Sequence, residues 1–405
     1  MRDCGLDALI ATSPVNVRYV TGYSCWLDEV FQRYMVSPGG SDERVLVSLA
    51  LLPADGEPAL VVDSLFALNA TEVAAEVVVA GHAELEEPDH REAGAVPEDL
   101  HAVYELLGRR EAGDTPSEAL VAAIKARGLA EAVLGVELSR IPAAVRDRLE
   151  RDLPRARLRD CSNLLRLVRA VKAEEELARL EQSARIAEQA AQASFAQARA
   201  GCTLGELVDE FRVAAAEQGA DFDHYALGPR GLGITTQRHI PLRAGETMYV
   251  DFGCNWRGYF SDSGTTLSVG EPGSTLRRRF DALRATVAAG AEALRPGVRA
   301  SAVQESMRAA LADHGITASY PHGHGFGLQV RDYPIVAPDN GSRIRDDCVD
   351  VPSDLTLEAG MVVNLEVPVF ARGSHSIHNE QSFVVTASGS GPLTEQPRDA
   401  PYVVG

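Results

Sequence analysis

The sequence contains very little lysine. Only Lys125 and Lys172 occur among its 405 residues, so arginine supplies nearly all of the positive charge. Acidic residues outnumber basic ones by 58 to 39, which gives a formal net charge of -19. Nucleic acids and anionic membranes bind to basic surfaces, so this charge balance argues against both as partners.

Paired cysteines and long apolar runs are also missing. The six cysteines are scattered and form no C-x-x-C pair, which is typical of reduced thiols in a cytoplasm. The first residues, "MRDCGLDALIATSP", lack the charged-then-apolar pattern of a secretory signal. No apolar run approaches the roughly 20 residues that a membrane helix needs. We therefore expect a soluble cytoplasmic protein.

The length favours two domains, because 405 residues exceed the range in which one core usually keeps growing. The first part alternates short strands with helices, which predicts a small mixed α/β domain. Its strand candidates are Leu6–Ala11, Val45–Leu52, Ala59–Val62, Val77–Ala80 and Val133–Glu137. Asp55-Gly56 predicts a turn between two of them, and a capping box at Thr115 predicts a helix that runs to Ala126.

A second domain is predicted from Arg169, where a long helix opens with apolar residues from Leu177 to Ala191 at helical spacing. Two later segments resemble each other: "RAGCTLGELVDEFRVAAAEQG" from Arg199, and "RPGVRASAVQESMRAALADHG" from Arg295. One interpretation is that these are two unrelated amphipathic helices with glycine at their ends, which match by chance. In the other, each belongs to one half of a duplicated domain, and a site lies between the halves.

The segment "VDFGCNWRGYFSDSGTT" predicts a β-hairpin with a two-residue turn at Trp256 and Arg257. In that register Asp251 lies directly opposite Asp262. Like charges that face each other on one side of a sheet destabilise it, so these two carboxylates need an explanation.

More ionisable side chains lie in three later segments. His322 and His324 are two residues apart in a glycine-rich stretch, so they share a face if the stretch is extended. In the strand "GMVVNLEVPVFARG" the only acidic residue is Glu366, on the face that also carries Val362, Asn364 and Pro368. The last strand, "HSIHNEQSFVVTASG", carries His378 and Glu380 on one face.

Four carboxylates in strand-rich sequence need counter-charges, because burying an unpaired carboxylate costs several kcal/mol. One interpretation is an acidic cluster clamped by arginine. Two divalent cations match four negative charges better, and oxygen donors with one imidazole favour Mn²⁺, Co²⁺, Fe²⁺ or Zn²⁺ over metals that select thiolates. The sequence therefore predicts that the facing aspartates are metal ligands.

Taken together, these segments resemble the "pita-bread" metallopeptidase family, which includes prolidase, aminopeptidase P, methionine aminopeptidase and creatinase. The similar stretches are "VDFGCNWRGYFSD", "GHGFGL", "LEAGMVVNLE", "HNEQSFVVT" and the creatinase-type start "GLDALIATSPVNVRYVTGY". The resemblance implies a creatinase-type N-terminal α/β domain over residues 1–168. It also implies an α+β pita-bread catalytic domain with an internal pseudo-twofold repeat over residues 169–405.

The family's five metal ligands match, in order, Asp251, Asp262, His324, Glu366 and Glu380. The resemblance implies two ions bridged by Asp262 and Glu380, with Mn²⁺ the first expectation and Co²⁺, Zn²⁺ or Fe²⁺ the others. Asp251 would complete one ion, and His324 with Glu366 the other. It further implies attack by a metal-bridging hydroxide, a proton carried by Glu366 and, by analogy, a homodimer.

The departures from the family lie around the substrate. Ile234 stands where the peptidases carry a substrate-contacting histidine, and His239 is a candidate replacement. Arg331 replaces a second histidine; it would anchor a substrate carboxylate or stabilise an oxyanion, or else pair with the acids of "IRDDCVD". Gly264 and Thr265 replace a threonine and an arginine.

Several residues are candidates for roles beyond metal binding. We expect Glu366, Arg331 and His322 to act in catalysis, and His239, Arg331 and His378 to contact the substrate. His322, His375 and His378 are also candidates for orienting the ligands, and for each of them a structural or solvent-exposed role stays open.

The leading functional hypothesis is a dinuclear metal-dependent hydrolase, an exopeptidase of the Xaa-Pro dipeptidase or aminopeptidase type, acting on a small peptide. The alternative is a non-peptidase of the same fold that acts on a small-molecule amide or compatible solute, as creatinase, ectoine hydrolase or the dimethylsulfoniopropionate lyase do. The changes around the substrate favour this alternative. A third hypothesis, a catalytically silent binding protein, is disfavoured by the five retained ligands.

Overall fold

The computed structural model describes residues 1–27, 46–81, 96–108, 113–394 and 400–405. The chain divides into two compact units, one of residues 1–165 and 344–350, the other of residues 166–343 and 351–405. A search of the described helices finds none with the length and apolar character of a membrane span. The start of the strand predicted at Val45 lies outside the described residues.

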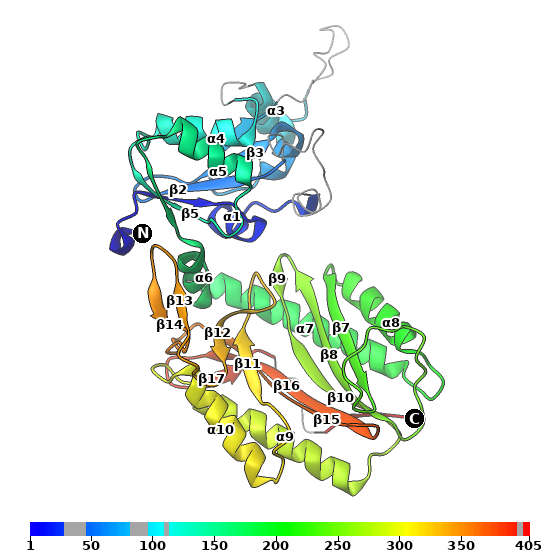
Figure 1. The fold of residues 1–405 in the computed structure, drawn as a ribbon. Helices are drawn as coiled ribbons and strands as arrows, with labels where there is room; N and C mark the ends of the chain where they lie inside the picture. Colours follow the sequence, from blue (N-terminus) through cyan, green and yellow to red (C-terminus); the bar gives the residue numbers. More distant parts are fainter. Residues whose placement is uncertain (28–45, 82–95, 109–112, 395–399) are drawn as a thin grey trace. The chain divides into compact units, whose positions relative to one another are not determined.

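The described strands of the first unit form one six-stranded sheet in the order β4-β3-β2-β1-β5-β6 (Figure 1). They are β1 (Ala8–Ala11), β2 (Leu49–Pro53), β3 (Ala59–Asp63), β4 (Glu76–Ala80), β5 (Val133–Val136) and β6 (Arg157–Asp160). The helices are α1 (Pro14–Thr21), α3 (His101–Gly108), α4 (Pro116–Ala126) and α5 (Ala143–Asp152), with 3-10 turns η1 (Arg2–Cys4), η4 (Ser64–Ala70) and η5 (Glu98–Leu100).

Local sequence signals performed well in this unit. Thr115 accepts a hydrogen bond from the Glu118 amide, and the Glu118 side chain accepts from the Thr115 amide, so the predicted capping box starts α4. Strand β6 was not predicted, because "RLRD" is a mostly charged segment at the edge of the sheet, where the alternation of apolar residues is lost.

Helix α6 (Ser162–Ala170) begins in the first unit and ends in the second, and the longer α7 (Glu174–Ala196) follows it. The prediction of a helix that opens at Arg169 is wrong at its start, because the chain leaves the helical path between them. There Val171 forms an isolated bridge with Met361, and the Lys172 amide donates to the Gly360 carbonyl at 3.0 Å. These contacts come from residues nearly 190 positions away, so no local pattern reports them.

The strands of the second unit form a ten-stranded sheet whose main path is β12-β11-β15-β16-β10-β8-β7. The strands are β7 (Asp221–Pro229), β8 (Thr247–Trp256), β9 (Tyr259–Phe260), β10 (Ser263–Val269), β11 (His322–Gly325), β12 (Asp332–Val336), β15 (Val362–Ala371), β16 (His375–Val385), β17 (Ser390–Pro392) and β18 (Tyr402–Val404). A separate hairpin pairs β13 (Arg343–Arg345) with β14 (Asp350–Pro352).

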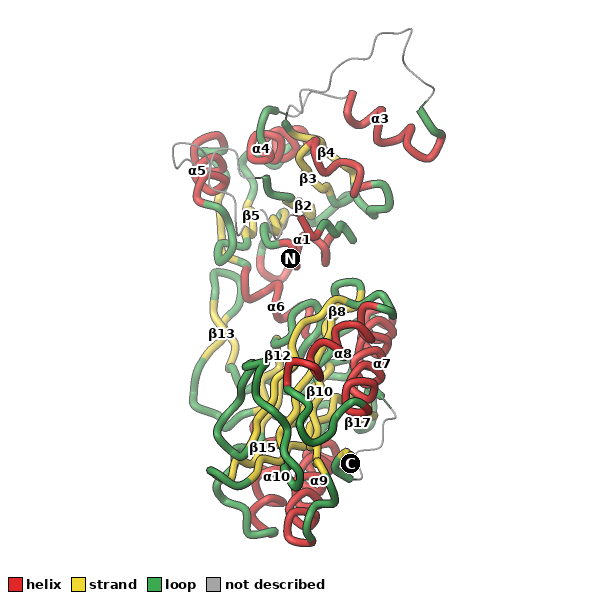
Figure 2. Tube along the Cα trace, turned by 90° about the vertical axis from the view of Figure 1, so that its right-hand side faces the viewer, coloured by secondary structure: helices red, strands yellow, loops and turns green. Residues whose placement is uncertain are grey.

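Two helix pairs cover one face of this sheet (Figures 1 and 2). Helices α7 and α8 (Leu204–Ala216) pack on β7 and β8, and α9 (Ser274–Ala293) and α10 (Ala300–Asp313) pack beside β11, β12, β15 and β16. Phe211 of α8 and Met307 of α10 are the matched positions of the two similar segments, and each is fully buried in its own core. The two similar segments therefore occupy corresponding places, one in each half of the sheet, and their origin in a duplication stays a prediction.

Strand alternation decides which side chains face away from the helices. In β8, Val250 and Phe252 enter the core under α7 and α8, so Asp251 points to the opposite face. In β15, Leu365 and Val367 enter the core under α9, so Glu366 points to that same opposite face. Both carboxylates are thus presented on the side that carries no helices.

The predicted register of the hairpin is wrong by two residues. Trp256 pairs with Tyr259 and Asp251 pairs with Gly264, so the turn residues are Arg257 and Gly258 instead of Trp256 and Arg257. The cause is a turn in which both central residues have positive φ, 51° at Arg257 and 82° at Gly258. A shift of two residues leaves every side chain on its original face, so the carboxylates still share one face.

We expect Gly258→Ala to destabilise the protein by about 1 kcal/mol, because a side chain disfavours the left-handed backbone that this turn requires. Thermal unfolding of the purified variant measures the effect. Gly389→Ala is the matched control, since Gly389 has an ordinary φ and nothing within 4 Å of an added Cβ. Equal loss of stability in both variants would contradict the assignment of the turn.

Candidate metal centre

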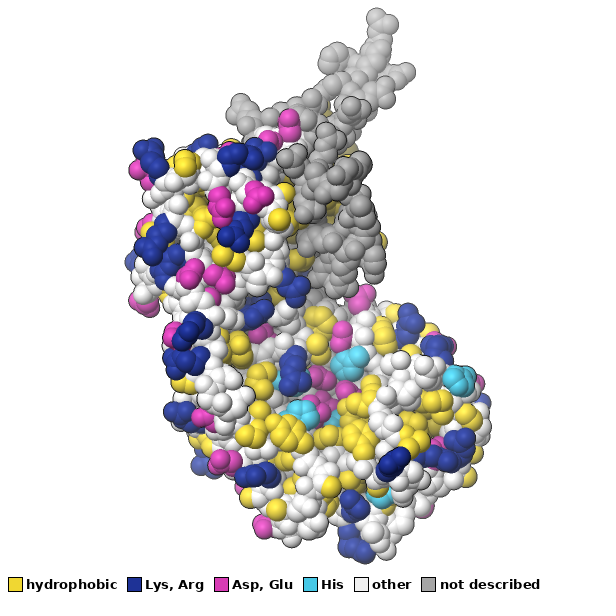
Figure 3. Space-filling model, in the orientation of Figure 1, with side chains coloured by type: hydrophobic (Ala, Val, Ile, Leu, Met, Phe, Trp, Pro, Cys, Tyr) yellow, Lys and Arg dark blue, Asp and Glu magenta, His cyan; other side chains and the backbone are white. Residues whose placement is uncertain are grey.

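Sheet register places three of the four predicted carboxylates in one row across adjacent strands. Glu366 of β15 pairs with Glu380 of β16, Glu380 pairs with Gly264 of β10, and Gly264 pairs with Asp251 of β8. Neighbouring strands lie about 4.8 Å apart, so such a row brings like charges close together. On the face shown in Figure 3, acidic and histidine side chains gather in a hollow of the second unit.

The fourth carboxylate, Asp262, lies in the short break between β9 and β10. Its Oδ2 is 3.2 Å from Nε2 of His324, which β11 presents from the other half of the sheet. Ser382 of β16 donates a hydrogen bond to the Asp262 carbonyl at 3.0 Å, which fixes the backbone at this break. The structure therefore brings all five predicted ligands to one place.

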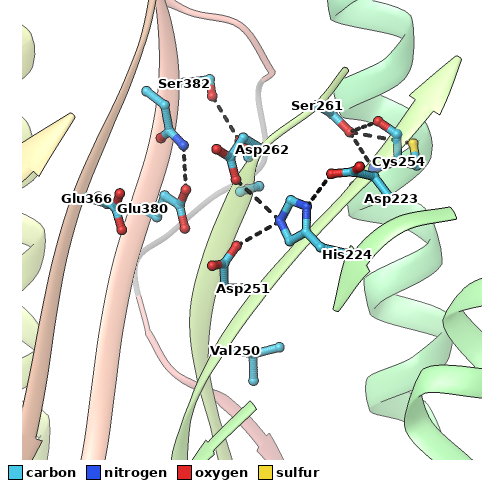
Figure 4. A network of polar contacts seen from close by, with 12 residues as sticks. Asp223, His224, Val250, Asp251, Cys254, Ser261, Asp262, Glu366, Glu380 and Ser382 are labelled. Carbon is cyan, nitrogen blue, oxygen red and sulfur yellow. Dashed lines mark hydrogen bonds and ion pairs between the residues drawn. The ribbon is translucent and has the colours of Figure 1, made fainter. Parts of the chain in front are cut away.

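Two histidines complete the cluster, and one of them was missed. His224 of β7 lies between the two aspartates: its Nε2 is 2.9 Å from Oδ1 of Asp251 and 3.4 Å from Oδ1 of Asp262 (Figure 4). Its Nδ1 is 2.7 Å from Oδ2 of Asp223. The only signal in the sequence was the Asp-His pair in an extended segment, and such pairs are common elsewhere.

His378 was predicted as a substrate contact, and the structure buries it completely. Its Nε2 lies 3.6 Å from Oε2 of Glu366 and 3.5 Å from Oε2 of Glu380. Its ring stacks on Tyr249 with ring centres 4.1 Å apart, and the Tyr249 hydroxyl donates to Asp251 at 2.7 Å. Tyr249 therefore holds groups on both sides of the cluster.

Within the described chain, the ion pairs of these carboxylates are made with histidine and none with arginine. His322 is the nearest partner of Glu366, with Nε2 2.8 Å from Oε1. The arrangement does not support the alternative of an acidic cluster clamped by arginine. Four histidines face the four carboxylates, so the histidines alone would neutralise the cluster only if every one of them were protonated.

Because the carboxylates are crowded together, their pKa values shift in different directions. Burial raises the pKa of Glu380 well above its ordinary value, and the negative charges of Asp262 and Asp251 raise it further. Burial also opposes ionisation of Glu366, but the hydrogen bond from His322 outweighs it and holds the pKa of Glu366 below its usual range. Asp262 likewise has a lowered pKa, because hydrogen bonds from His224 and His324 outweigh burial.

Unpaired buried atoms test whether divalent ions fit here. Among the described residues, Oε2 of Glu380 and Nε2 of His378 are buried and have no hydrogen-bond partner. Native proteins rarely leave such atoms unsatisfied unless an ion or water completes them. The two atoms lie 3.5 Å apart, a separation that a cation bound to both would fit. The donor set of oxygens and imidazoles suits divalent transition metals.

The remaining predicted residues lie at the margin or outside the cluster. Arg331 is exposed and, among the described residues, makes no hydrogen bond or ion pair; its positive charge opposes protonation of the nearby His322. The alternative of an ion pair between Arg331 and "IRDDCVD" is therefore not observed. His375 hydrogen-bonds to Ser374 at the start of β16, and burial lowers its pKa.

His239 is exposed, and its neighbours hold the backbone against α8: the carbonyls of Arg238 and Ile240 each accept an amide hydrogen bond of 2.9 Å from the first turn of that helix. Ile234 is also exposed. That His239 contacts the substrate stays a prediction, as do the catalytic roles of Arg331 and His322.

We expect Glu380→Gln to raise the melting temperature of the metal-free protein, with a larger gain at pH 7.5 than at pH 4.5. Glu380 has a raised pKa in the folded state, so the folded protein loses stability as pH rises above the unfolded pKa near 4.5, and glutamine removes that loss. Calorimetry after chelation measures it. Glu305→Gln, at an exposed position of α10, is the control; a gain independent of pH would contradict the assigned repulsion.

Comparison with known proteins agrees with this geometry. A Xaa-Pro dipeptidase from Lactobacillus delbrueckii subsp. lactis is 26% identical over 251 residues, and a peptidase from Bacillus subtilis is 26% identical over 241 residues. The matches cover 60% and 57% of this chain, and the chain spans 64% of each relative. The crystal structure of X-Pro aminopeptidase from Thermotoga maritima has the same fold, with a TM-score of 0.74, 18% identity and coverage of 99% of this chain and 98% of that one.

Two family descriptions divide the sequence between them. Residues 1–171 match the Creatinase/Prolidase N-terminal domain, and residues 178–387 match Metallopeptidase family M24. The second match contains every residue of the cluster described above, and it extends over more than half of the chain. This protein belongs to metallopeptidase family M24.

Proposed function

We propose that this protein is a dinuclear metal-dependent hydrolase of the Xaa-Pro dipeptidase or aminopeptidase type, which cleaves short peptides behind their N-terminal residue. The observation that carries the proposal is the row of carboxylates with unpaired buried atoms in the catalytic fold of the family. The relative named as a Xaa-Pro dipeptidase supports the choice of substrate. The cytoplasmic location and the homodimer stay predictions from the sequence.

Five side chains would hold the ions: Asp251, Asp262, His324, Glu366 and Glu380. Two divalent ions bound there would supply a water of lowered pKa and polarise the carbonyl of the scissile bond. The protein's contribution is to fix the donors on β-strands that two packed cores hold from behind. Rigid strands position such donors more precisely than loops do.

Glu366 is the carboxylate best placed to move a proton. Its side chain is 12% exposed, whereas that of Glu380 is 2% exposed, so Glu366 lies nearer to an entering substrate. The hydrogen bond from His322 keeps Glu366 ionised, and an ionised carboxylate at this position can accept a proton from the attacking water. The same carboxyl then protonates the leaving amine, and the His322 hydrogen bond orients it throughout.

The substrate side of the site also supports a second candidate, a non-peptidase that acts on a small-molecule amide. The specific observation is Arg331, an exposed guanidinium near His322 with no protein partner among the described residues. An unpaired arginine is suited to binding a carboxylate through two parallel hydrogen bonds. Such a substrate carboxylate exists in a dipeptide and in many small metabolites.

Mass spectrometry of products would decide between these candidates. The metal-loaded protein is incubated with Xaa-Pro dipeptides, Xaa-Pro-Yaa tripeptides and matched peptides without proline. We expect release of the N-terminal residue from the Xaa-Pro set, and the preferred length separates dipeptidase from aminopeptidase. No cleavage by protein that holds its ions would overturn the peptidase proposal and favour the small-molecule amide.

We expect Glu366→Gln to retain the fold and lose turnover by several orders of magnitude, because glutamine cannot carry the proton. Single-turnover kinetics on the best substrate from the panel, with circular dichroism as a check of folding, measure this. The matched control is Glu358→Gln, at an exposed position just before β15. Turnover within tenfold of the parent protein would contradict the role given to Glu366.

We expect Arg331→Gln to raise KM at least tenfold for substrates with a free carboxylate and to leave KM nearly unchanged for the same compounds with an amide cap. The difference follows because only the charged group can form the paired hydrogen bonds. Arg308→Gln, at an exposed position of α10, is the control. An equal change for free and capped substrates would show that Arg331 does not bind a carboxylate.

A further inference from the structure

We propose that His224 and His378 are themselves metal ligands, so that each ion takes one imidazole in addition to the five donors described above. One ion would be shared by His224, Asp251 and Asp262, and the other by His378, Glu366 and Glu380. In each of these two groups the candidate donor atoms lie within 4.8 Å of one another. The inference rests on the proposed function only in requiring that the site binds metal.

The hydrogen bond of His378 assigns its free lone pair. Nδ1 lies 3.2 Å from the Val250 carbonyl, and a carbonyl oxygen only accepts, so Nδ1 carries the hydrogen. In the neutral ring, Nε2 then presents a lone pair to Glu366 and Glu380. Its distances of 3.5 and 3.6 Å exceed those of hydrogen bonds, so this nitrogen is not acting as a donor to either carboxylate. A cation between the three groups or a proton on Nε2 removes the repulsion there, and the imidazole count given below distinguishes the two.

His224 has the orientation of a metal-binding histidine at the other end of the cluster. Its Nδ1 lies 2.7 Å from the Asp223 carboxylate, and its Nε2 faces Asp251 and Asp262. Histidines that bind metals commonly donate their second ring nitrogen to a carboxylate or a backbone carbonyl, which fixes the ring and raises its basicity. Asp223 performs this role for His224, and the Val250 carbonyl performs it for His378.

The separations between donors match those of ligands on a common ion. Two donors each about 2.1 Å from one ion lie about 3.0 Å apart at a right angle and about 3.4 Å apart at the tetrahedral angle. The four nitrogen-to-oxygen distances are 2.9 and 3.4 Å at His224, and 3.5 and 3.6 Å at His378. The distances at His224 lie within this span or just below it, where the 2.9 Å contact is also a hydrogen bond, and those at His378 lie slightly above it, so a small movement of the side chains suffices for coordination.

Two glycines make room for the two rings. A Cβ at Gly264 would lie 2.4 Å from Cε1 of His378 and 2.2 Å from Oε2 of Glu380. A Cβ at Gly253 would lie 2.4 Å from Cε1 of His224. Gly264 is one of the departures in "SDSGTT", and this contact explains it: the missing side chain is the space that His378 occupies.

The additional imidazoles change the expected metal. With His324 the site has three nitrogen donors for two ions, and imidazole suits Zn²⁺, Co²⁺ and Fe²⁺ better than it suits Mn²⁺. We therefore expect Zn²⁺ or Co²⁺ to bind at least tenfold more tightly than Mn²⁺. A site built from carboxylates and His324 alone would show a smaller preference.

X-ray absorption of the zinc-loaded protein counts the imidazoles directly. We expect about 1.5 imidazoles per zinc ion when His224, His324 and His378 all bind, and about 0.5 when His324 binds alone. A value near 0.5 would overturn the proposal. The count is made without any substrate, so two bound ions with no peptide cleavage would refute the proposed function and leave this inference standing.

Variants separate coordination from simple charge compensation. We expect His378→Ala and His224→Ala each to weaken Zn²⁺ binding at least tenfold in competition with a chelator, and His314→Ala, exposed at the end of α10, to leave it unchanged. The melting temperature of each metal-free variant is the second measurement. Unchanged zinc affinity with a lower metal-free melting temperature would overturn the proposal, because it would show the histidines acting only as partners of the carboxylates.

Should either alanine variant fail to fold, Gly264→Ala tests the same geometry from the opposite side. Its added Cβ displaces both the His378 ring and the Glu380 carboxylate and keeps every donor residue in the chain, so the imidazole count, which only the histidine changes, is the deciding measurement. We expect the same loss of zinc affinity and a fall in the imidazole count. Unaltered zinc binding by this variant would also overturn the proposal.

Discussion

Repulsion between carboxylates in one row of a β-sheet is the constraint on which the second unit depends. Sheet register aligns Glu366, Glu380 and Asp251 across adjacent strands, and Asp262 approaches from the break before β10. Bringing buried like charges together costs several kcal/mol unless they are compensated. Histidines lie within 3.5 Å of every one of these carboxylates, and two ions would complete the balance of charge.

The arrangement of the second unit in two halves explains how such a cluster is held. Each half of the unit packs a helix pair on one face of its strands, and the two cores leave the opposite face free for polar side chains. The alternation of each strand then sends its apolar residues to the helices and its ionisable residues to the site. The apolar residues of each strand therefore determine the positions of Asp251, Glu366 and Glu380, and Asp262 alone among the four carboxylates lies in a short break between two strands.

Much of the site was predictable from the sequence because strand alternation is local. The faces of β15 and β16, the capping box of α4 and the grouping of Asp251, Glu366 and Glu380 all followed from patterns of a few residues and from the resemblance to a known family. Features set by distant contacts were not predictable. The hairpin register depended on Arg257 adopting a positive φ, and the break before α7 depended on a bridge to Met361. The place of His224 beside the aspartates depended on the register of β7 with β8.

Gly264, which differs from the family pattern, shows why a changed residue is hard to interpret from the sequence alone. In the sequence it stands more than 110 positions from His378; in the sheet, the backbone at Gly264 is what the His378 ring rests against. The absence of a side chain there and the presence of an imidazole on the next strand form one structural feature. The glycine is explained only by the histidine ring beside it, and the ring fits only because the glycine has no side chain.

The most direct test of this account is anomalous diffraction from crystals of the zinc-loaded protein, recorded on both sides of the zinc absorption edge. The account predicts two peaks within the cluster, one beside Asp251 and Asp262 and one beside Glu366 and Glu380. A well-ordered second unit with neither peak, under conditions in which zinc is in excess, would show that the carboxylates are balanced by protons and histidines alone. That result would contradict the central claim that this row of charges exists to hold metal.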